Sequence, residues 1–156
     1  MKINIQKDLE KYQLTIAYTA PASLKEAWDL LATDAGFSLW FPQLKIEEDK
    51  LVFEMENFRE TMDLLAYRPH EEIAYSWDRA KVTFSLSQQE QETHILFEEE
   101  IPVDFGNKFA DAKKDMTGWL VQNECIQALL HHQELPDHKL LQEKWAAFLE
   151  EELKQV

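Results

Sequence analysis

The sequence predicts an α+β protein in which a curved antiparallel sheet grips one long helix. Two observations support this fold class. Residues 104–133 carry apolar side chains at spacings of three and four, which is the pattern of one helical face, and Pro102 and Pro136 flank them. Most of the preceding chain alternates apolar and polar residues in short runs about ten residues apart. A meander of this kind has one apolar face that needs a cover, and the long helix is the predicted cover.

Length and composition indicate a single globular domain spanning residues 1–156. The chain is long enough to bury a core, and 45% of its residues are apolar. Aromatic residues make up 12%, which favours a packed aromatic core over an aromatic-lined pocket. The formal charge is −14, from 30 acidic and 16 basic residues. This charge disfavours nucleic acids and anionic membranes as partners and leaves a basic protein partner open.

Cysteine usage and hydropathy bear on the compartment. Cys125 is the only cysteine, so no intramolecular disulfide can form, and its place between apolar positions predicts a buried structural thiol. The first ten residues alternate polar and apolar types and do not resemble a signal peptide. No window approaches the roughly 20 apolar residues of a membrane-spanning helix. We therefore expect a cytoplasmic protein.

The first part of the chain predicts a hairpin and two short helices. Residues 3–5 and 12–18 alternate and form the hairpin. Residues 23–26 fit a capping box, with Ser at the N-cap and Glu at the third helical position, so a helix follows over residues 24–32. Thr33-Asp34 offers a second cap, and a second short helix covers residues 35–40. Their connection is so short that we expect a tight pair under the concave side of the sheet.

Six further alternating runs predict strands, at residues 44–46, 51–56, 59–67, 73–77, 82–86 and 95–101. One position conflicts with this pattern, because Glu99 falls by parity on the apolar, inward face. Either the strand bulges there or a carboxylate points into the interior. A bulge is the favoured interpretation.

A second amphipathic stripe follows Pro136 and predicts an extra terminal helix within residues 137–154. Its apolar positions are Leu140, Leu141, Trp145, Phe148 and Leu149. We expect this helix to pack back on the core, which spans residues 3–133, and a dimer contact is the alternative. The chain is therefore expected to be a monomer or a homodimer.

Several short motifs occur in a specific order: Ala20-Pro21, Glu26-Ala27-Trp28, Trp40-Phe41-Pro42, Tyr75-Ser76-Trp77, Val82-Thr83-Phe84 and Met116-Thr117-Gly118-Trp119. Together they resemble bacterial single-domain members of the heat-shock protein 90 ATPase activator-like family, within the START-like (SRPBCC) superfamily. The resemblance covers roughly residues 3–133.

The resemblance implies the helix-grip fold, in which a seven-stranded antiparallel sheet wraps the C-terminal helix and a cavity often lies between them. Such domains commonly bind hydrophobic small molecules, and a few relatives are cyclases. The family label implies a chaperone cofactor active in the stress response. The eukaryotic relative that gave this label carries a further domain, which this chain lacks, so we expect chaperone activation less than ligand binding.

Patterns typical of other chemistries are missing. The three glycines, Gly36, Gly106 and Gly118, form no phosphate-binding loop. His131 and His132 are adjacent and would point about 100° apart on a helix, unlike a helical metal site. No nucleophile–histidine–acid pattern stands out. We therefore predict no metal, no cofactor and no catalytic residue, and expect that the protein is not an enzyme.

The remaining candidate is an apolar site between sheet and helix. Its predicted residues are Phe37, Trp40, Phe41, Phe53, Tyr75, Trp77, Phe84, Met116, Trp119 and Asn123. Asn123 is the polar position on an apolar stripe and would orient a ligand, unless it is exposed at the helix edge. The glycine before Trp119 predicts a close approach by another element.

Three functions follow from this site. The first is binding of a small hydrophobic or aromatic molecule that enters past Trp40 and Phe41 and stacks on Trp77 or Trp119. The second is a chaperone-cofactor or other protein-interaction role that uses the acidic surface. The third is a cyclase-type enzyme, which would need Glu99 or Tyr75 as an inward acid or base. A filled core is the alternative to any cavity, and we favour ligand binding.

Overall fold

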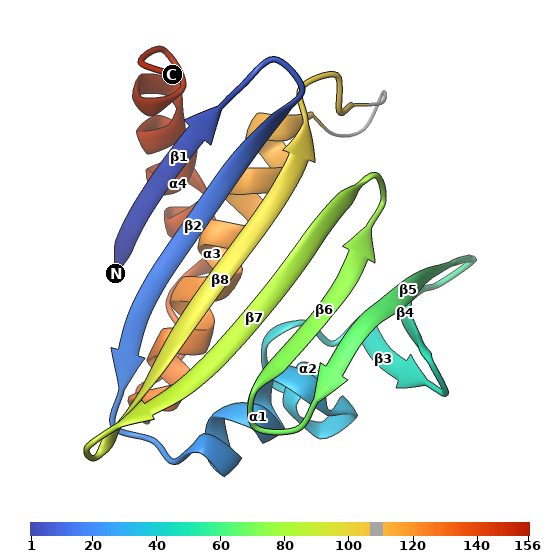
Figure 1. The fold of residues 1–156 in the computed structure, drawn as a ribbon, viewed down its shortest axis with the longest axis vertical. Coiled ribbons are helices and arrows are strands. Elements are labelled where there is room, and N and C mark those ends of the chain that lie inside the picture. Colours follow the sequence, from blue (N-terminus) through green and yellow to red (C-terminus); the bar gives the residue numbers. More distant parts are fainter. Residues whose placement is uncertain (107–110) are drawn as a thin grey trace.

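In the computed structural model, which describes residues 1–106 and 111–156, eight antiparallel strands form one sheet (Figure 1). Their spatial order is β1-β2-β8-β7-β6-β5-β4-β3. The strands are β1 (Lys2–Lys7), β2 (Lys11–Ala20), β3 (Leu44–Glu47), β4 (Lys50–Met55), β5 (Phe58–Arg68), β6 (Glu72–Trp77), β7 (Ala80–Gln89) and β8 (Glu92–Pro102).

The α+β class and the helix-grip arrangement are confirmed, but the predicted number of seven strands is wrong. The N-terminal hairpin contributes two separate strands to the sheet. β1 pairs with β2 from Lys2–Ala17 to Lys7–Tyr12 and forms an edge, while β2 pairs on its other side with β8. The alternating runs predict these two strands and six more, eight in all, whereas the number seven came only from the family resemblance.

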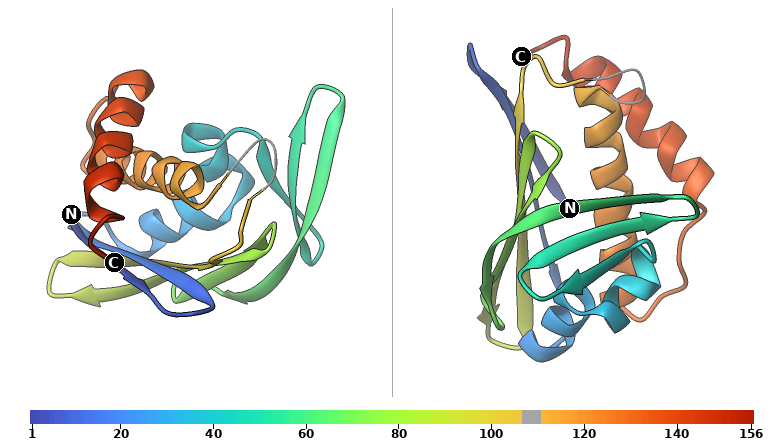
Figure 2. Two further views of the ribbon diagram at one scale, coloured as in Figure 1. Left: turned by 90° about the horizontal axis from the view of Figure 1, so that it is seen from above. Right: turned by 90° about the vertical axis from the view of Figure 1, so that its right-hand side faces the viewer.

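Four helices lie on one face of the sheet: α1 (Leu24–Ala32), α2 (Asp34–Trp40), α3 (Ala112–Leu130) and α4 (His138–Glu152) (Figure 2). The sheet curls toward the helices at its β3–β5 end, so that it partly encloses α3. A register shift between Leu64 and Ala66 in the β5–β6 pair accompanies this bend. The two short helices pack as a pair, as the short connection predicted, and they lie near one end of α3.

Side-chain caps start these helices where the sequence predicted. The Ser23 hydroxyl accepts a hydrogen bond from the Glu26 backbone N–H at 3.0 Å, and the Thr33 hydroxyl accepts one from the Gly36 N–H at 3.1 Å. Such caps satisfy backbone donors that have no partner within the helix. The caps therefore determine the position of the α1–α2 pair, and with it the position of the aromatic residues that follow.

The long helix is shorter than predicted, because it begins at Ala112 rather than near residue 104 and ends at Leu130. Phe105, predicted on the helical stripe, is buried in the preceding loop, where its N–H donates to the Pro102 carbonyl at 2.9 Å. Phe109, predicted on the same stripe, lies outside the described residues. Apolar spacing continued across a loop that also packs on the core, so periodicity alone overextended the helix.

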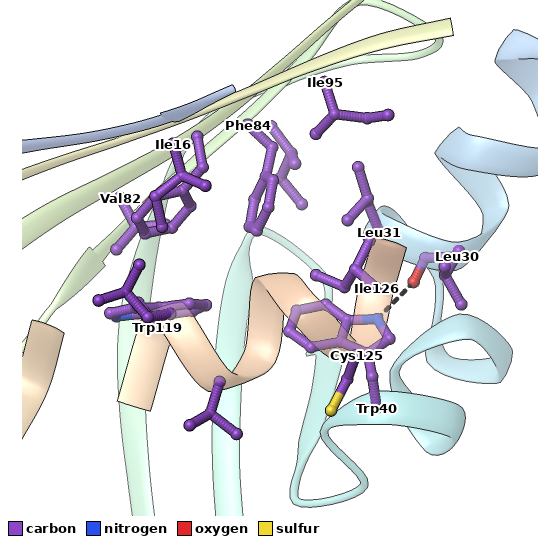
Figure 3. Packing of buried hydrophobic residues seen from close by; sticks show 14 of the residues in the cluster. Ile16, Leu30, Leu31, Trp40, Val82, Phe84, Ile95, Trp119, Cys125 and Ile126 are labelled. Carbon is purple, nitrogen blue, oxygen red and sulfur yellow. Dashed lines mark hydrogen bonds between the residues drawn. The ribbon is translucent and has the colours of Figure 1, made fainter. Parts of the chain in front are cut away.

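The core fills the space between the sheet and α3 (Figure 3). Its largest side chains are less than 2% exposed and come from β2, α1, α2, β4, β6, β7, β8 and α3. Trp119 lies beneath Val82 and Phe84, and the Trp40 indole N–H donates to the Leu30 carbonyl at 2.8 Å. Side chains from strands that are distant in sequence thus cover the face of α3 that points toward the sheet.

The predicted terminal helix is confirmed as α4, which packs against the outer side of α3. Leu141, Trp145 and Leu149 are buried along its inner face. The Trp145 indole N–H donates to Glu124 at 3.1 Å, which joins the two helices. Cys125 is buried on α3, and burial together with the charge of Glu124 raises the pKa of its thiol to about 11. Over the described ranges, no helix is long and apolar enough to cross a membrane.

Candidate functional site

The predicted site residues divide into two groups. Seven are buried in the core, namely Phe37, Trp40, Tyr75, Phe84, Met116, Trp119 and Asn123. Phe41, Phe53 and Trp77 are half-buried. The buried rings pack against one another, with centroids 5.0 Å apart for Phe84–Phe97 and 5.1 Å for Phe97–Trp119. Aromatic side chains therefore occupy the centre of the space between sheet and helix.

Asn123 is fully buried, so the alternative of an exposed helix-edge position is wrong. Its side-chain oxygen accepts a hydrogen bond from the Tyr18 hydroxyl at 2.8 Å, and its amide nitrogen donates to the Trp119 carbonyl at 2.9 Å. Burial raises the pKa of Tyr18 well above its ordinary value. This pair links β2 to α3 across the core, so the polar position on the apolar stripe already has protein partners.

A solvent-facing hollow of about 260 Å³ lies beside the N-terminal half of α3 and is lined by Phe41, Trp77, Lys114, Asp115, Gly118, Trp119 and Gln122. We call it the aromatic groove. It brings together three of the predicted site residues from the end of α2, from β6 and from α3. The other four lining residues were missed by the sequence analysis.

Three aromatic rings form one wall of the aromatic groove. Their centroids are 5.1 Å apart for Trp77–Trp119, 5.6 Å for Phe41–Trp77 and 6.3 Å for Phe41–Trp119. Phe53 extends the cluster, 6.0 Å from Phe41. These distances are typical of edge-to-face and tilted aromatic contacts. The predicted stacking residues Trp77 and Trp119 therefore lie side by side, with Trp77 and Phe41 only half-buried.

Gly118 forms an open part of the groove, and the predicted close approach of another element is wrong. A Cβ atom added to Gly118 would meet nothing within 4 Å. By contrast, a Cβ on Gly36 would lie 2.1 Å from the Asp29 carbonyl oxygen, so α1 and α2 pack closely there. An exposed glycine inside a helix costs about 1 kcal/mol relative to alanine. No neighbouring element at Gly118 requires a glycine, so close packing does not explain this loss of stability. The glycine instead leaves the helix backbone accessible from the groove.

Three of the missed residues follow a recognisable spacing on α3. Asp115, Gly118 and Gln122 stand with the predicted Trp119 at positions i, i+3, i+7 and i+4, which is one stripe of a helix. Within the described part of the chain, Asp115 Oδ2 and Gln122 Oε1 are buried oxygens that accept no hydrogen bond. A polar residue one helical turn on either side of a Gly-Trp pair was the signal available in the sequence.

Glu99 points into the interior, so the favoured bulge is wrong. β8 runs in unbroken register past it, with Glu99 opposite Leu14 on β2 and Val82 on β7. Its side chain is 0% exposed, and neither carboxyl oxygen has a hydrogen-bond partner among the described residues. The parity of the strand was therefore correct, and the cost of burying a carboxylate did not force a bulge.

Buried acidic groups meet where Glu99 faces α3. Burial, and secondarily the neighbouring Asp115 carboxyl, raise the pKa of Glu99 well above its ordinary value. Burial also raises the pKa of Asp115, against the opposing effects of Glu99 and the Trp77 side chain. The pKa of the Tyr75 hydroxyl is raised by burial and by Glu99. Burial therefore favours the protonated form of Glu99, and Asp115 connects this buried acid to the groove.

Other hollows and histidine side chains lie apart from the aromatic groove. A larger hollow of about 560 Å³ lies between α1, α2 and the C-terminal end of α3, and it includes none of the predicted site residues. His131 lies 3.1 Å from the Thr19 carbonyl oxygen, and His132 lies 2.8 Å from Glu26, so the adjacent histidines face different partners. In the described ranges no three His, Cys, Asp or Glu side chains are grouped to hold a metal.

No protein-family model matches the chain, and no curated protein matches its sequence. Solved structures do match its fold. A conserved protein of unknown function from Enterococcus faecalis is 21% identical with a TM-score of 0.81, covering 96% of this chain and 91% of that one. CalU16 from Micromonospora echinospora is 14% identical with a TM-score of 0.65, covering 93% and 91%. The Aha1 dimer from Colwellia psychrerythraea is 14% identical with a TM-score of 0.59, covering 76% and 96%. These similarities establish the helix-grip fold.

Proposed function

We propose that this protein is a START-like binding module for a small hydrophobic molecule with a flat ring, held in the aromatic groove. The observation that carries the proposal is the open space at Gly118 beside Trp77 and Trp119. A ring placed there would contact the helix backbone on one side and aromatic side chains on the other. Its entry would pass Phe41, whereas Trp40, the other residue of the expected entrance, is buried in the core.

The size of the groove limits the ligand. A cavity of about 150 Å³ lined by apolar side chains can hold benzene. A groove of about 260 Å³ therefore suits one or two rings rather than a lipid or a polyketide-sized molecule. Burial of a flat ring at roughly 25 cal/mol per Å² contributes a few kcal/mol, part of which offsets the entropy lost on association. We expect dissociation constants in the micromolar to millimolar range for simple probes.

The ligand therefore lies beside α3 and near the surface, rather than deep between helix and sheet. The buried rings of Phe84, Phe97 and Trp119 occupy the deeper space. Enlarging the deeper space would require several of these rings to leave a closely packed core, which is costly. The groove needs no such rearrangement, because Phe41 and Trp77 on its aromatic wall are already partly exposed.

Tryptophan fluorescence tests the proposal, since Trp77 and Trp119 line the groove. Wild-type protein titrated with indole or naphthalene should show a saturable change in emission and a higher melting temperature. Gly118→Leu places a side chain in the open space and should abolish both effects. Ala147→Leu adds the same side chain at an exposed position of α4 and should leave both effects intact. Absence of a saturable signal in the wild type would overturn the proposal.

A homodimer is a separate proposal about assembly. The solved Aha1 protein from Colwellia psychrerythraea is named as a dimer, and it shares the fold of this chain. Sedimentation equilibrium over a hundredfold range of concentration would test it. A single species of 18.4 kDa at all concentrations would rule out the dimer.

A further inference from the structure

We propose that the ligand of the aromatic groove is a ring-bearing amine, whose positively charged nitrogen lies against Asp115 while its ring covers Gly118. This inference rests on the proposed function and specifies the ligand class of the same groove. It follows from the Asp115 carboxyl group and the aromatic rings that line the groove, and from the spacing of Asp115 and Gly118 along α3.

The first step concerns charge. Asp115 lines the groove, is half-buried, and has one oxygen, Oδ2, that accepts no hydrogen bond from the described residues. The buried Glu99 carboxyl adjoins it on the inner side, and Asp78 acts on it as a nearby negative charge. A partly buried carboxyl group without a cationic partner is costly, and a cation placed in the groove would supply that partner.

The second step concerns the aromatic wall. The faces of Phe41, Trp77 and Trp119 carry negative electrostatic potential, and cations within about 6 Å of such a ring centroid are attracted to it. Two of the three rings are indoles, which are the strongest cation–π partners among the side chains. The carboxyl group and the rings line the same hollow, so one ammonium group can interact with both.

The third step concerns length. Asp115 precedes Gly118 by three residues, which is a rise of about 4.5 Å along an α-helix. A ring centred on Gly118 therefore needs an amine on a linker of one or two carbon atoms to reach Asp115. A phenylethylamine or benzylamine skeleton has this length, whereas an amine attached directly to the ring would fall short.

Lys114 is the competing charge, because its ammonium group also lines the groove and would favour a ligand with a carboxylate. Lys114 is exposed, whereas Asp115 is half-buried. Solvent and salt screen an exposed charge on a flexible stem more than a partly buried one. The net charge of −14 also attracts cations to the protein surface. The balance therefore favours the amine over the acid.

The experiment compares three probes with the same ring on wild-type protein at neutral pH and low salt: 2-phenylethylamine, 2-phenylethanol and 3-phenylpropionate. We expect the amine to bind about tenfold more tightly than the alcohol or better, and the acid to bind most weakly. Equal affinities, or a preference for the acid, would overturn the amine inference and leave the proposed function standing. If none of the three binds while indole does, the amine inference also fails. If no ring compound binds, both fail together.

Variants assign the preference to Asp115. Asp115→Asn should bring the affinity of the amine down to that of the alcohol, with the affinity of the alcohol nearly unchanged. Glu143→Gln removes one negative charge from an exposed position of α4 and should preserve the preference. Retention of the full preference in Asp115→Asn would overturn the assignment. Circular dichroism of each variant verifies the fold, and the comparison of probes on the wild type stands without any variant.

Discussion

Glu99 on β8 and Asp115 on α3 bring two carboxyl groups together across the boundary between sheet and helix. Glu99 has no exposure and no hydrogen-bond partner among the described residues, and Asp115 lines the aromatic groove. Each group influences the protonation of the other. The protein therefore holds a buried acid directly behind its candidate binding site, a position that usually costs stability.

The first prediction concerns the dependence of stability on pH. The pKa of Glu99 is raised in the folded protein from an ordinary value of 4.5, chiefly by burial, with Asp115 of α3 as its closest acidic neighbour and the Tyr75 hydroxyl also near. Above pH 4.5, folding therefore takes up a proton at Glu99. The stabilisation from Glu99 is fully present below pH 4.5, and it is lost as the pH rises toward the pKa of Glu99 in the folded protein. One such proton gives a slope of at most about 1.4 kcal/mol per pH unit.

Glu99→Gln removes this titration while keeping the size of the side chain. Urea unfolding at pH 5, 6, 7 and 8 should show the variant gaining stability relative to the wild type as pH rises, with the smallest difference at pH 5. Glu98→Gln, the adjacent and outward-facing position on β8, should parallel the wild type. Parallel curves for Glu99→Gln and the wild type would contradict the prediction.

The second prediction concerns the two glycines of the helices. Gly118→Ala should raise the free energy of unfolding by about 1 kcal/mol, because the added methyl group meets open space and alanine favours the helix. Gly36→Ala should lower it, since its Cβ would lie 2.1 Å from the Asp29 carbonyl oxygen. Chemical denaturation of both variants measures the contrast. Destabilisation by Gly118→Ala would mean that another element does approach this backbone.

The third prediction concerns the buried hydrogen bond between Tyr18 and Asn123. Tyr18→Phe removes the donor and leaves the Asn123 oxygen without its partner, so it should cost about 1–3 kcal/mol of stability. A double-mutant cycle with Asn123→Leu should show favourable coupling between the two residues. Because this pair lies in the core, Tyr18→Phe should leave the affinity for ring probes unchanged. A large loss of affinity would instead place the ligand deeper than the groove.

The fourth prediction concerns the docking of α4. Leu149 is 0% exposed on its inner face, and Leu149→Ala should cost about 2–5 kcal/mol of unfolding free energy. Leu140→Ala, on the same helix and 65% exposed, should change it by less than about 0.5 kcal/mol. Urea denaturation measures both. Similar small effects for the two variants would show that α4 contributes little to the stability of the domain.

Much of the fold was predictable because the signals are local. Alternation identified the strands, and the Ser23 and Thr33 caps placed the starts of the two short helices. The predictions failed where a local pattern carried no information about tertiary packing. Phe105 continued the apolar spacing of α3 yet lies in a loop, because loops that cover a core also carry apolar residues.

The candidate site was predictable in part. Phe41 was predicted at the entrance, Trp77 on the inward face of a strand and Trp119 on the long helix, and all three line the groove. Asp115, Gly118 and Gln122 were missed, because a polar helix residue usually faces solvent and only its neighbours reveal an unpaired oxygen. The inward position of Glu99 followed from strand parity, but the carboxyl group that faces it comes from another element.

Local sequence patterns were enough to predict which elements form, which face of each is apolar, and that one long helix covers one curved sheet. Those properties depend on residues close together in the chain. The packing of distant elements, by contrast, places aromatic rings at the centre of the space between sheet and helix and leaves the open volume at Gly118. Free volume depends on how side chains from α2, β6, β7, β8 and α3 fit against one another, and no short stretch of sequence encodes that fit.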